Sequence, residues 1–237
     1  IYIELYKFGE KMVSGIELFN LKGKRALITG SSQGIGFALA KGLSSAGAEI
    51  VLNGRDKAKL EKSAKDLNSE YSLFQLSFDV TNQKEVKQKI DEFEKNFGSI
   101  EILINNAGMQ YRTPLEEFPS EMFEKLLHTN ISSVFNVSQV VAKHMIKRGH
   151  GKIINIASVQ TLLARPGIAP YTATKGAVGN LTKGMATDWA KYGIQCNAIA
   201  PGYFDTPLNA ALVSDKDFTS WLEKRTPAGR WGKVEEL

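Results

Sequence analysis

The feature that most constrains the fold is a regular alternation of short apolar segments with longer helical ones. From residue 25 onward, helix-length segments separate "RALIT", "EIVLN", "YSLFQLSF", "IEILIN", "GKIINIA" and "IQCNAIA". Strands joined by helix-length crossovers pair in parallel, and continuously apolar strands are buried on both faces. The sequence therefore predicts an α/β fold, a doubly wound parallel sheet with helices on both faces. We expect helices over about 35–46, 57–68, 120–128 and 132–147, and one ending near 97 that Thr81 caps.

The chain shows no internal repeat, low-complexity tract or linker, so we expect a single domain over residues 18–237 that includes the substrate site. We expect residues 1–17 to be an N-terminal extension, of which residues 1–11 are extra sequence outside the fold. Its charges, among them Glu4, Lys7 and Glu10, argue against a secretory signal, and Met12 is a candidate natural start. The only cysteine, Cys196, excludes an internal disulfide, fits a reducing cytoplasm and is expected to be buried in a strand.

Composition narrows the choice of partners. The net charge of +5 raises the idea of nucleic-acid binding, but basic residues alternate with acids, as in "DKAKLEKSAKDLNSE", which is typical of solvated helix faces. We therefore expect no nucleic-acid partner. No apolar segment is long enough to span a membrane. The three histidines, His128, His144 and His150, lack metal-ligand spacing, and no metal site is expected.

A glycine-rich turn follows the first predicted strand. In "LITGSSQGIGFALAKGL", Gly30, Gly34 and Gly36 precede an amphipathic helix. Glycine permits a tight turn and a close backbone approach, and a helix N-terminus attracts a pyrophosphate. The pattern indicates a Rossmann-type dinucleotide site at the carboxyl ends of the strands.

The second strand bears on the choice of dinucleotide. It ends in "NGR", with no acid for a ribose diol and with Arg55 suited to a 2′-phosphate, so NADP is favoured over NAD. The alternative is that Arg55 is a solvated loop residue paired with Asp56. Asp79 closes the third strand, either to accept a hydrogen bond from adenine or as a turn acid. In "NNAG", at 105–108, neighbouring asparagines can also tie strands together.

A tyrosine stands four residues before a lysine in "PYTATKGAVGNLTKG". Tyr171 and Lys175 would lie one helical turn apart, so the ammonium can lower the pKa of the phenol and make it a proton donor near neutral pH. A chance match at this spacing is common, and the pair is informative only with the other motifs.

In order, these motifs carry a family resemblance: "TGSSQGIG" at 29–36, Asp79, "NNAG", Asn130, Ser158, Tyr171 with Lys175, and "PG" at 201–202. Over nearly the whole of 18–237 the sequence resembles the short-chain dehydrogenase/reductase family. Segments such as "GMQYRTPLEEFP", "LARPGIAPYTATKGAVGN" and "NAIAPGYFDTPL" resemble its gluconate 5-dehydrogenases. The resemblance implies a cytoplasmic, homotetrameric, NADP-dependent oxidoreductase that interconverts D-gluconate and 5-keto-D-gluconate.

The resemblance also implies roles for single residues. Tyr171 exchanges a proton with the substrate oxygen, Ser158 holds that oxygen, Lys175 binds the nicotinamide ribose and Asn130 anchors a water. The alternatives are a packing tyrosine, a surface lysine, a turn-forming serine and an asparagine at a helix N-cap. The cofactor-binding residues would be Gly30, Ser32, Gln33, Gly34, Ile35, Gly36, Arg55, Asp79, Val80, Asn106, Ala107, Gly108, Tyr171, Lys175, Pro201, Gly202 and Thr206.

A sugar-acid substrate needs a cation for its carboxylate. Arg112 is the first choice and Arg165 the second, and each has a structural salt bridge as its alternative. Gln160 and Tyr203, with Ser158 and Tyr171, complete the predicted substrate-binding set. We expect residues 203–218 to form a mobile lid.

Two departures from the family pattern bear on these expectations. Gln33 stands where many NADP-linked members have a basic residue, and the family continues by about twenty residues, enough for a helix and a strand, past Leu237. A reductase of another polyol, keto sugar or small ketone is the nearest alternative function. A non-catalytic dinucleotide sensor is the alternative from another class.

Overall fold

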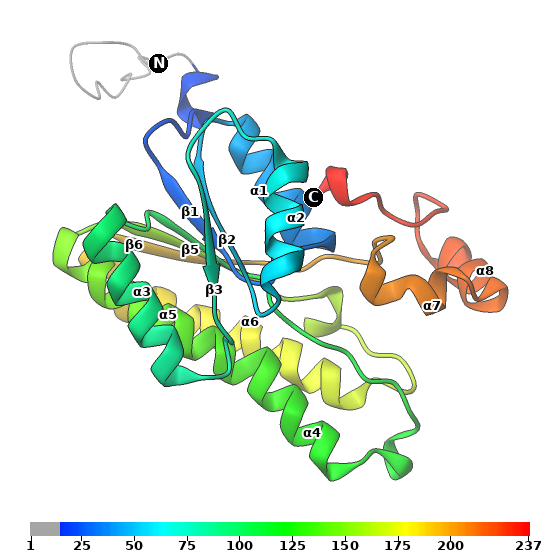
Figure 1. Ribbon diagram of the computed structural model, residues 1–237. Helices are drawn as coiled ribbons and strands as arrows, with labels where there is room; N and C mark the ends of the chain where they lie inside the picture. Colours follow the sequence, from blue (N-terminus) through cyan, green and yellow to red (C-terminus); the bar gives the residue numbers. More distant parts are fainter. Residues whose placement is uncertain (1–14) are drawn as a thin grey trace, which may run out of the picture.

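The computed structural model describes residues 15–237 and contains one six-stranded parallel sheet (Figure 1). The strand order is β3-β2-β1-β4-β5-β6, and every neighbouring pair is parallel. This confirms the predicted doubly wound fold. The strands are β1 Arg25–Ile28, β2 Glu49–Gly54, β3 Leu73–Ser77, β4 Ile102–Asn105, β5 Gly151–Ile156 and β6 Ile194–Ile199.

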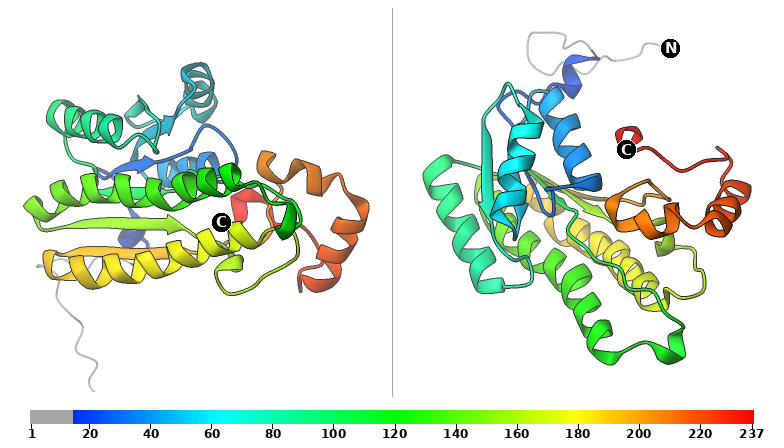
Figure 2. Two further views of the ribbon diagram at one scale, coloured as in Figure 1. Left: turned by 90° about the horizontal axis from the view of Figure 1, so that it is seen from below. Right: turned by 45° about the vertical axis from the view of Figure 1, so that its right-hand side comes forward.

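Helices cover both faces of this sheet. Alternate residues of β1 point to opposite sides, so that Leu27 packs in one apolar cluster with α3, α5 and α6, while Ala26 and Ile28 pack in the other with α1 and α2. Helices α7 and α8 stand out from this body beside the carboxyl ends of the strands (Figure 2). The helices are α1 Gly34–Ser45, α2 Lys57–Leu67, α3 Gln83–Phe97, α4 Ser120–Leu127, α5 Ser133–Arg148, α6 Ala169–Trp189, α7 Ala210–Val213 and α8 Lys216–Arg225.

Two expected helix boundaries are wrong. Asn82, rather than Thr81, caps α3, because its Oδ1 accepts from the backbone N–H of Glu85 at 3.2 Å, while the Thr81 hydroxyl donates to Asp79 Oδ1 at 2.8 Å. The expected gap between α4 and α5 is instead a π-helical turn, His128–Ser132, that joins them into one continuous rod.

Of the expected N-terminal extension, residues 1–14 lie outside the described part of the chain, and the 3-10 turn Glu17–Phe19 is its first regular element. Cys196 is 7% exposed in β6 and packs in the core, as expected. Within residues 15–237, no helix has the length and hydropathy needed to cross a bilayer.

Buried amides fix the relative positions of the central strands. Asn105 Nδ2, at the end of β4, donates to Asn155 Oδ1 of β5 and to Ser138 Oγ of α5, both at 2.8 Å. Asn155 Nδ2 in turn donates to Thr182 Oγ1 of α6 at 2.9 Å. The expectation that neighbouring asparagines tie strands together is confirmed, and the network holds the carboxyl ends of β4 and β5 in register.

Two glycines of α1 provide a matched test of close packing. A Cβ on Gly36 would lie 2.4 Å from Asn106 Nδ2 and 2.6 Å from Gly30 O, whereas one on Gly42 would meet nothing within 4 Å. We expect Gly36→Ala to lower the free energy of unfolding by about 1–3 kcal/mol because of overpacking. Gly42→Ala should raise it by up to about 1 kcal/mol through helix propensity. Urea unfolding measures both, and equal effects would contradict the packing analysis.

Candidate active site

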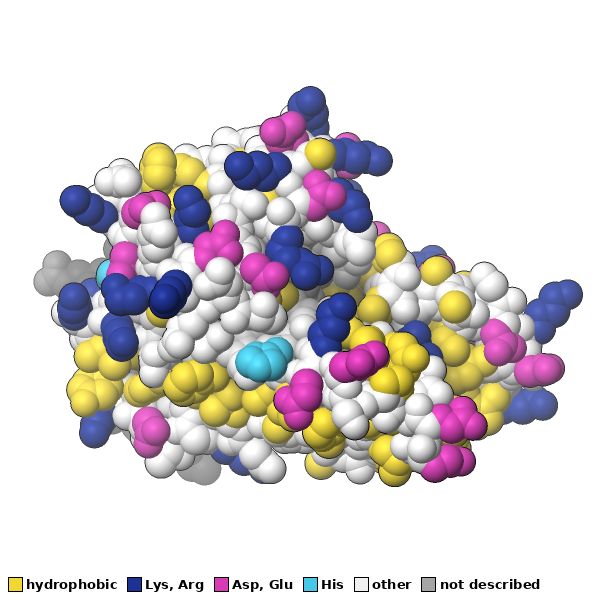
Figure 3. Space-filling view, turned by 60° about the horizontal axis from the view of Figure 1, so that its bottom comes forward, with side chains coloured by type: hydrophobic (Ala, Val, Ile, Leu, Met, Phe, Trp, Pro, Cys, Tyr) yellow, Lys and Arg dark blue, Asp and Glu magenta, His cyan; other side chains and the backbone are white. Residues whose placement is uncertain are grey.

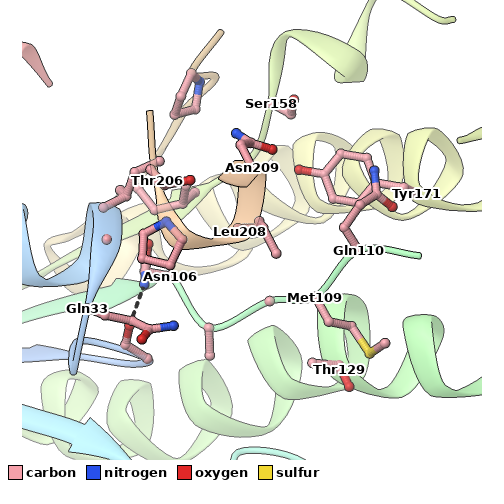
Figure 4. A pocket seen from close by; sticks show the side chains of 18 of the residues that line it. Gln33, Asn106, Met109, Gln110, Thr129, Ser158, Tyr171, Thr206, Leu208 and Asn209 are labelled. Carbon is pink, nitrogen blue, oxygen red and sulfur yellow. Dashed lines mark hydrogen bonds between the residues drawn. The ribbon is translucent and has the colours of Figure 1, made fainter. Parts of the chain in front are cut away.

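A cavity of about 560 Å³ opens at the carboxyl ends of the strands. Figure 4 shows its interior, with Gln33 and Asn106 near the start of α1 and with Ser158, Tyr171 and Asn209 gathered at the other end. Every site residue expected from the sequence lines this cavity except Gly36 and Asn130, which lie behind its wall. The described chain therefore brings the predicted cofactor and substrate residues into one continuous cleft.

The glycine-rich turn forms one end of the cleft. Gly30 has φ +61°, and a Cβ there would lie 2.8 Å from Ala107 Cα, so the turn closes against the loop after β4. Asn106 Nδ2 ties the two loops together through Thr29 O and Gly30 O, each at 3.0 Å. The N-cap residue of α1, Gln33, forms no side-chain capping hydrogen bond with the described residues. The first-turn N–H groups of this helix are thus left for an anion, as a dinucleotide pyrophosphate requires.

Arg55 and Asp79 face each other beside this turn. Arg55 Nη1 lies 3.6 Å from Asp79 Oδ2, and the Arg55 side chain is 76% exposed. The alternative pairing with Asp56 is wrong, because the Asp56 carboxylate accepts from the N–H of Lys59 at 3.1 Å and caps α2. Burial raises the pKa of Asp79, but hydrogen bonds from Thr81 and the Arg55 charge outweigh it and hold that pKa below its usual value.

Tyr171 lies near the start of α6 with its hydroxyl beside Ser158, which follows β5. Ser158 Oγ also accepts from the N–H of Gln160 at 3.2 Å, so the turn-forming alternative describes part of what this serine does. Burial raises the pKa of Tyr171, and the hydrogen bond with Ser158 and the charge of Arg112 only partly oppose it. The phenol is therefore held in its protonated form.

Lys175 is buried beneath Tyr171, so the surface-lysine alternative is wrong. Its Nζ donates to Ile156 O at 2.7 Å and lies 5.7 Å from the centre of the Tyr171 ring. Burial lowers the pKa of Lys175 to about 8. The expectation that Lys175 lowers the pKa of the phenol needs correction. The net shift at Tyr171 is upward because burial dominates, and the cation that opposes it is Arg112.

Asn130 occupies the π-helical turn and is 1% exposed. Its Oδ1 accepts from the N–H of Met109 at 2.9 Å, and its Nδ2 donates to Met109 O at 3.0 Å and to Thr174 Oγ1 at 3.1 Å. The N-cap alternative is wrong. This side chain instead fastens the loop after β4 to the helix that carries Tyr171 and Lys175.

Two arginines line the end of the cavity near Tyr171. Arg112 Nη2 donates to Asn209 Oδ1 at 3.1 Å, and Arg165 Nε donates to Tyr203 Oη at 2.8 Å. The salt-bridge alternative is wrong for both, because neither pairs with an acid of the described residues. Burial, and then the charge of Arg165, lower the pKa of Arg112.

The expected lid segment packs around an aromatic cluster. Tyr203 makes edge-to-face contacts with Phe218, Trp221 and Trp231, at centroid distances of 5.6, 6.3 and 5.8 Å. The mobility expected of residues 203–218 stays a prediction. Sequence reasoning missed several residues of the cavity wall, and for these the only signal was proximity to a recognised motif: Lys59, Met109, Gln110, Thr129, Leu208 and Asn209.

Comparisons with known proteins agree with this geometry. The family model described as short chain dehydrogenase matches residues 24–217. A gluconate 5-dehydrogenase of Gluconobacter oxydans is 58% identical over 222 residues, which cover 93% of this chain and 87% of that protein. A 5-keto-D-gluconate 5-reductase of Escherichia coli is 47% identical over the same shares of both chains. A crystal structure of a gluconate 5-dehydrogenase from Burkholderia cenocepacia in complex with NADP and tartrate has a TM-score of 0.91 at 57% identity, covering 93% of this chain and 87% of that one.

The chain belongs to the short-chain dehydrogenase family. It is accordingly an oxidoreductase that acts on CH–OH groups.

The buried ammonium of Lys175 makes stability depend on pH in a defined direction. The pKa of this ammonium falls from 10.5 to about 8 on folding, so between pH 8 and pH 10.5 Lys175 is protonated in the unfolded chain but largely neutral in the folded one. The burial of this amine therefore lowers the free energy of unfolding less and less as the pH rises from 8 toward 10.5. We expect Lys175→Met to raise the free energy of unfolding of the cofactor-free protein at pH 7 by about 2 kcal/mol. The gain should shrink by pH 10.

The control is Lys183→Met, an exposed lysine on the same helix, which should change stability by less than about 0.5 kcal/mol at either pH. Urea unfolding at both pH values gives the comparison. A Lys175→Met gain that does not change between pH 7 and pH 10 would contradict the proposed desolvation.

Proposed function

We propose that this protein is an NADP-dependent dehydrogenase that interconverts D-gluconate and 5-keto-D-gluconate. The observation that carries the proposal is the placement of the Tyr171 hydroxyl beside Ser158 and above the buried Lys175, inside a cleft that begins at a glycine-rich turn. The relatives named gluconate 5-dehydrogenase and 5-keto-D-gluconate 5-reductase support the substrate.

The residues of the cleft fit a dinucleotide. The close approach at Gly30 and the uncapped N-terminus of α1 suit a pyrophosphate, and the Arg55 guanidinium is free enough to meet a 2′-phosphate. The Burkholderia relative is described in complex with NADP, which supports NADP over NAD. When bound, the nicotinamide would exchange a hydride with the carbinol carbon.

The protein's part of the chemistry is to hold and move a proton at the substrate oxygen. A phenol kept protonated by burial is suited to donate a proton to an oxygen that becomes negative during reduction. The Ser158 hydroxyl would hold this oxygen in line. Lys175 would bind the nicotinamide ribose, and Asn130 would keep the supporting loop and helix together, with a water beside them.

The substrate would lie between Tyr171 and the arginines. Arg112 would pair with the carboxylate of gluconate, since its fork fits a carboxylate and no acid among residues 15–237 occupies it. The Gln160 Oε1 atom is buried with no partner among the described residues, and we assign it to a substrate hydroxyl, as we do the Tyr203 hydroxyl.

The proposal extends to the oligomeric state and the cellular location of the protein. We propose a cytoplasmic homotetramer with no nucleic-acid partner. Exposed aromatic side chains on α4 and α5, Phe123 and Phe135, support contact between subunits there. Figure 3 shows acidic and basic side chains intermingled across the face that it presents, with a band of hydrophobic ones among them.

A related substrate is the nearest competitor, because relatives 36–42% identical are named 2-dehydro-3-deoxy-D-gluconate 5-dehydrogenases. Initial rates with 5-keto-D-gluconate and a panel of other keto acids, keto sugars and ketones, following NADPH absorbance, separate the candidates. Turnover of another ketone without turnover of 5-keto-D-gluconate would remove the substrate assignment.

Tyr171→Phe tests the assignment of the proton donor. The substitution removes the hydroxyl and keeps the ring, so we expect the rate of 5-keto-D-gluconate reduction to fall by about 1,000-fold or more while NADPH still binds. Tyr192→Phe, in the exposed 3-10 turn Ala190–Tyr192 that follows α6, is the matched control and should retain full activity. Full activity of Tyr171→Phe would show that Tyr171 is not the proton donor, whereas the absence of turnover in the wild-type protein would favour the non-catalytic sensor.

Arg55→Gln tests the choice of dinucleotide. Losing a charge-assisted contact with the 2′-phosphate should raise the KM for NADPH by about 10- to 100-fold and leave the KM for NADH nearly unchanged. Lys57→Gln removes an equal charge from the start of α2, outside the cavity wall, and should alter neither. A wild-type preference for NADH would show that Arg55 does not read a phosphate.

A further inference from the structure

The end of the cavity near Tyr171 has an excess of positive charge over what the proposed substrate needs. Arg112 follows β4 and Arg165 follows β5, two strands that pair directly, and both side chains line the same cavity. The carboxylates of the described cavity wall, Asp56 and Asp79, follow β2 and β3 at the dinucleotide end. Gluconate carries one carboxylate, which leaves one guanidinium without a counter-ion.

Within the described chain, the hydrogen bonds and the ring contact of these two guanidiniums are all made with neutral groups. Arg112 donates from Nη2 to Asn209 Oδ1, and its Nε is buried without a partner. Arg165 donates from Nε to Tyr203 Oη and from Nη1 to Pro166 O at 3.0 Å, and its guanidinium lies 5.1 Å from the centre of the Phe218 ring. Its Nη2 forms no hydrogen bond with the described residues.

These contacts hold both forks in place but neutralise neither charge. A partly buried cation that lacks an anion is costly, and two such cations in one cavity repel each other. An anionic ligand that meets both of them removes both penalties. Their fixed orientation also reduces the entropy lost when such a ligand binds.

We infer that Arg112 and Arg165 form a two-arginine site that binds hydroxy dicarboxylates, such as the sugar diacids, more tightly than the monocarboxylate substrate. Arg112 takes the carboxylate that gluconate and a diacid share, and Arg165 takes the second carboxylate through its free Nη2. The inference rests on the proposed function for its choice of gluconate as the reference ligand. Hydroxy dicarboxylates are then competitive ligands of the substrate site.

Calorimetric titration of the NADPH-loaded protein tests this without turnover, because none of the probes carries a ketone that NADPH can reduce. The probes are D-glucitol, D-gluconate and D-glucarate, which share a six-carbon hydroxylated chain and carry no, one and two carboxylates. We expect the Kd to fall by about tenfold or more with each added carboxylate. Equal Kd values for D-gluconate and D-glucarate would overturn the inference.

Variants assign the two charges. Arg165→Gln should raise the Kd of D-glucarate to that of D-gluconate and change the Kd of D-gluconate by less than about threefold. Arg112→Gln should instead raise the Kd of both acids. Arg165→Lys, which keeps the charge, should restore part of the preference for D-glucarate and provides a second variant if Arg165→Gln unfolds. Arg165→Gln weakening both acids equally, with an unchanged unfolding midpoint, would contradict the assignment.

Lys216→Gln, an exposed lysine at the start of α8 and outside the cavity wall, separates a local site from general attraction of anions to a basic protein. It should leave all three Kd values unchanged. Loss of the D-glucarate preference in this control would overturn the local site. Absence of 5-keto-D-gluconate turnover with the D-glucarate preference intact would refute the proposed function alone.

Discussion

Parallel pairing of six strands places every loop that follows a strand at one edge of the sheet, and the site depends on this constraint. The strand order reverses between β1 and β4, where one connection crosses to the opposite face. The loops after these two strands therefore diverge and leave a crevice. Gly30 and Ala107 close its floor, and the buried amides of Asn105 and Asn155 keep β4 and β5 aligned so that Ser158 meets Tyr171.

Electrostatics inside the crevice act against local stability. Lys175 keeps its amine in a nearly dry position where it donates to a backbone carbonyl, and Arg112 has no acid to pair with in the described part of the chain. Such groups are tolerated because the two apolar clusters on either side of the sheet supply the stability. The site is thus preorganised for the negative charge of its ligands, and its unpaired cations indicate that these ligands are anions.

Local patterns were enough to predict some features, and tertiary position decided the others. The apolar runs were enough to predict the six strands β1 to β6, and the glycine-rich turn was enough to predict where a dinucleotide would bind. Both features depend on residues that are neighbours in the sequence. The cap of α3 moved from Thr81 to Asn82, since the Thr81 hydroxyl is taken by Asp79. The partner of Lys175 is a carbonyl nineteen residues away, and that of Arg112 is an asparagine ninety-seven residues away, so no spacing rule could reveal them.

The aromatic cluster beside the cavity has an optical consequence. Of the chain's three tryptophans, Trp221 and Trp231 both pack against Tyr203, while Trp189 ends α6. Intrinsic emission of the protein is thereby weighted toward the segment that borders the ligands. Any rearrangement of that segment changes the polarity around two indoles at once. Tryptophan fluorescence therefore reports conformational changes at the mouth of the cleft without an added label.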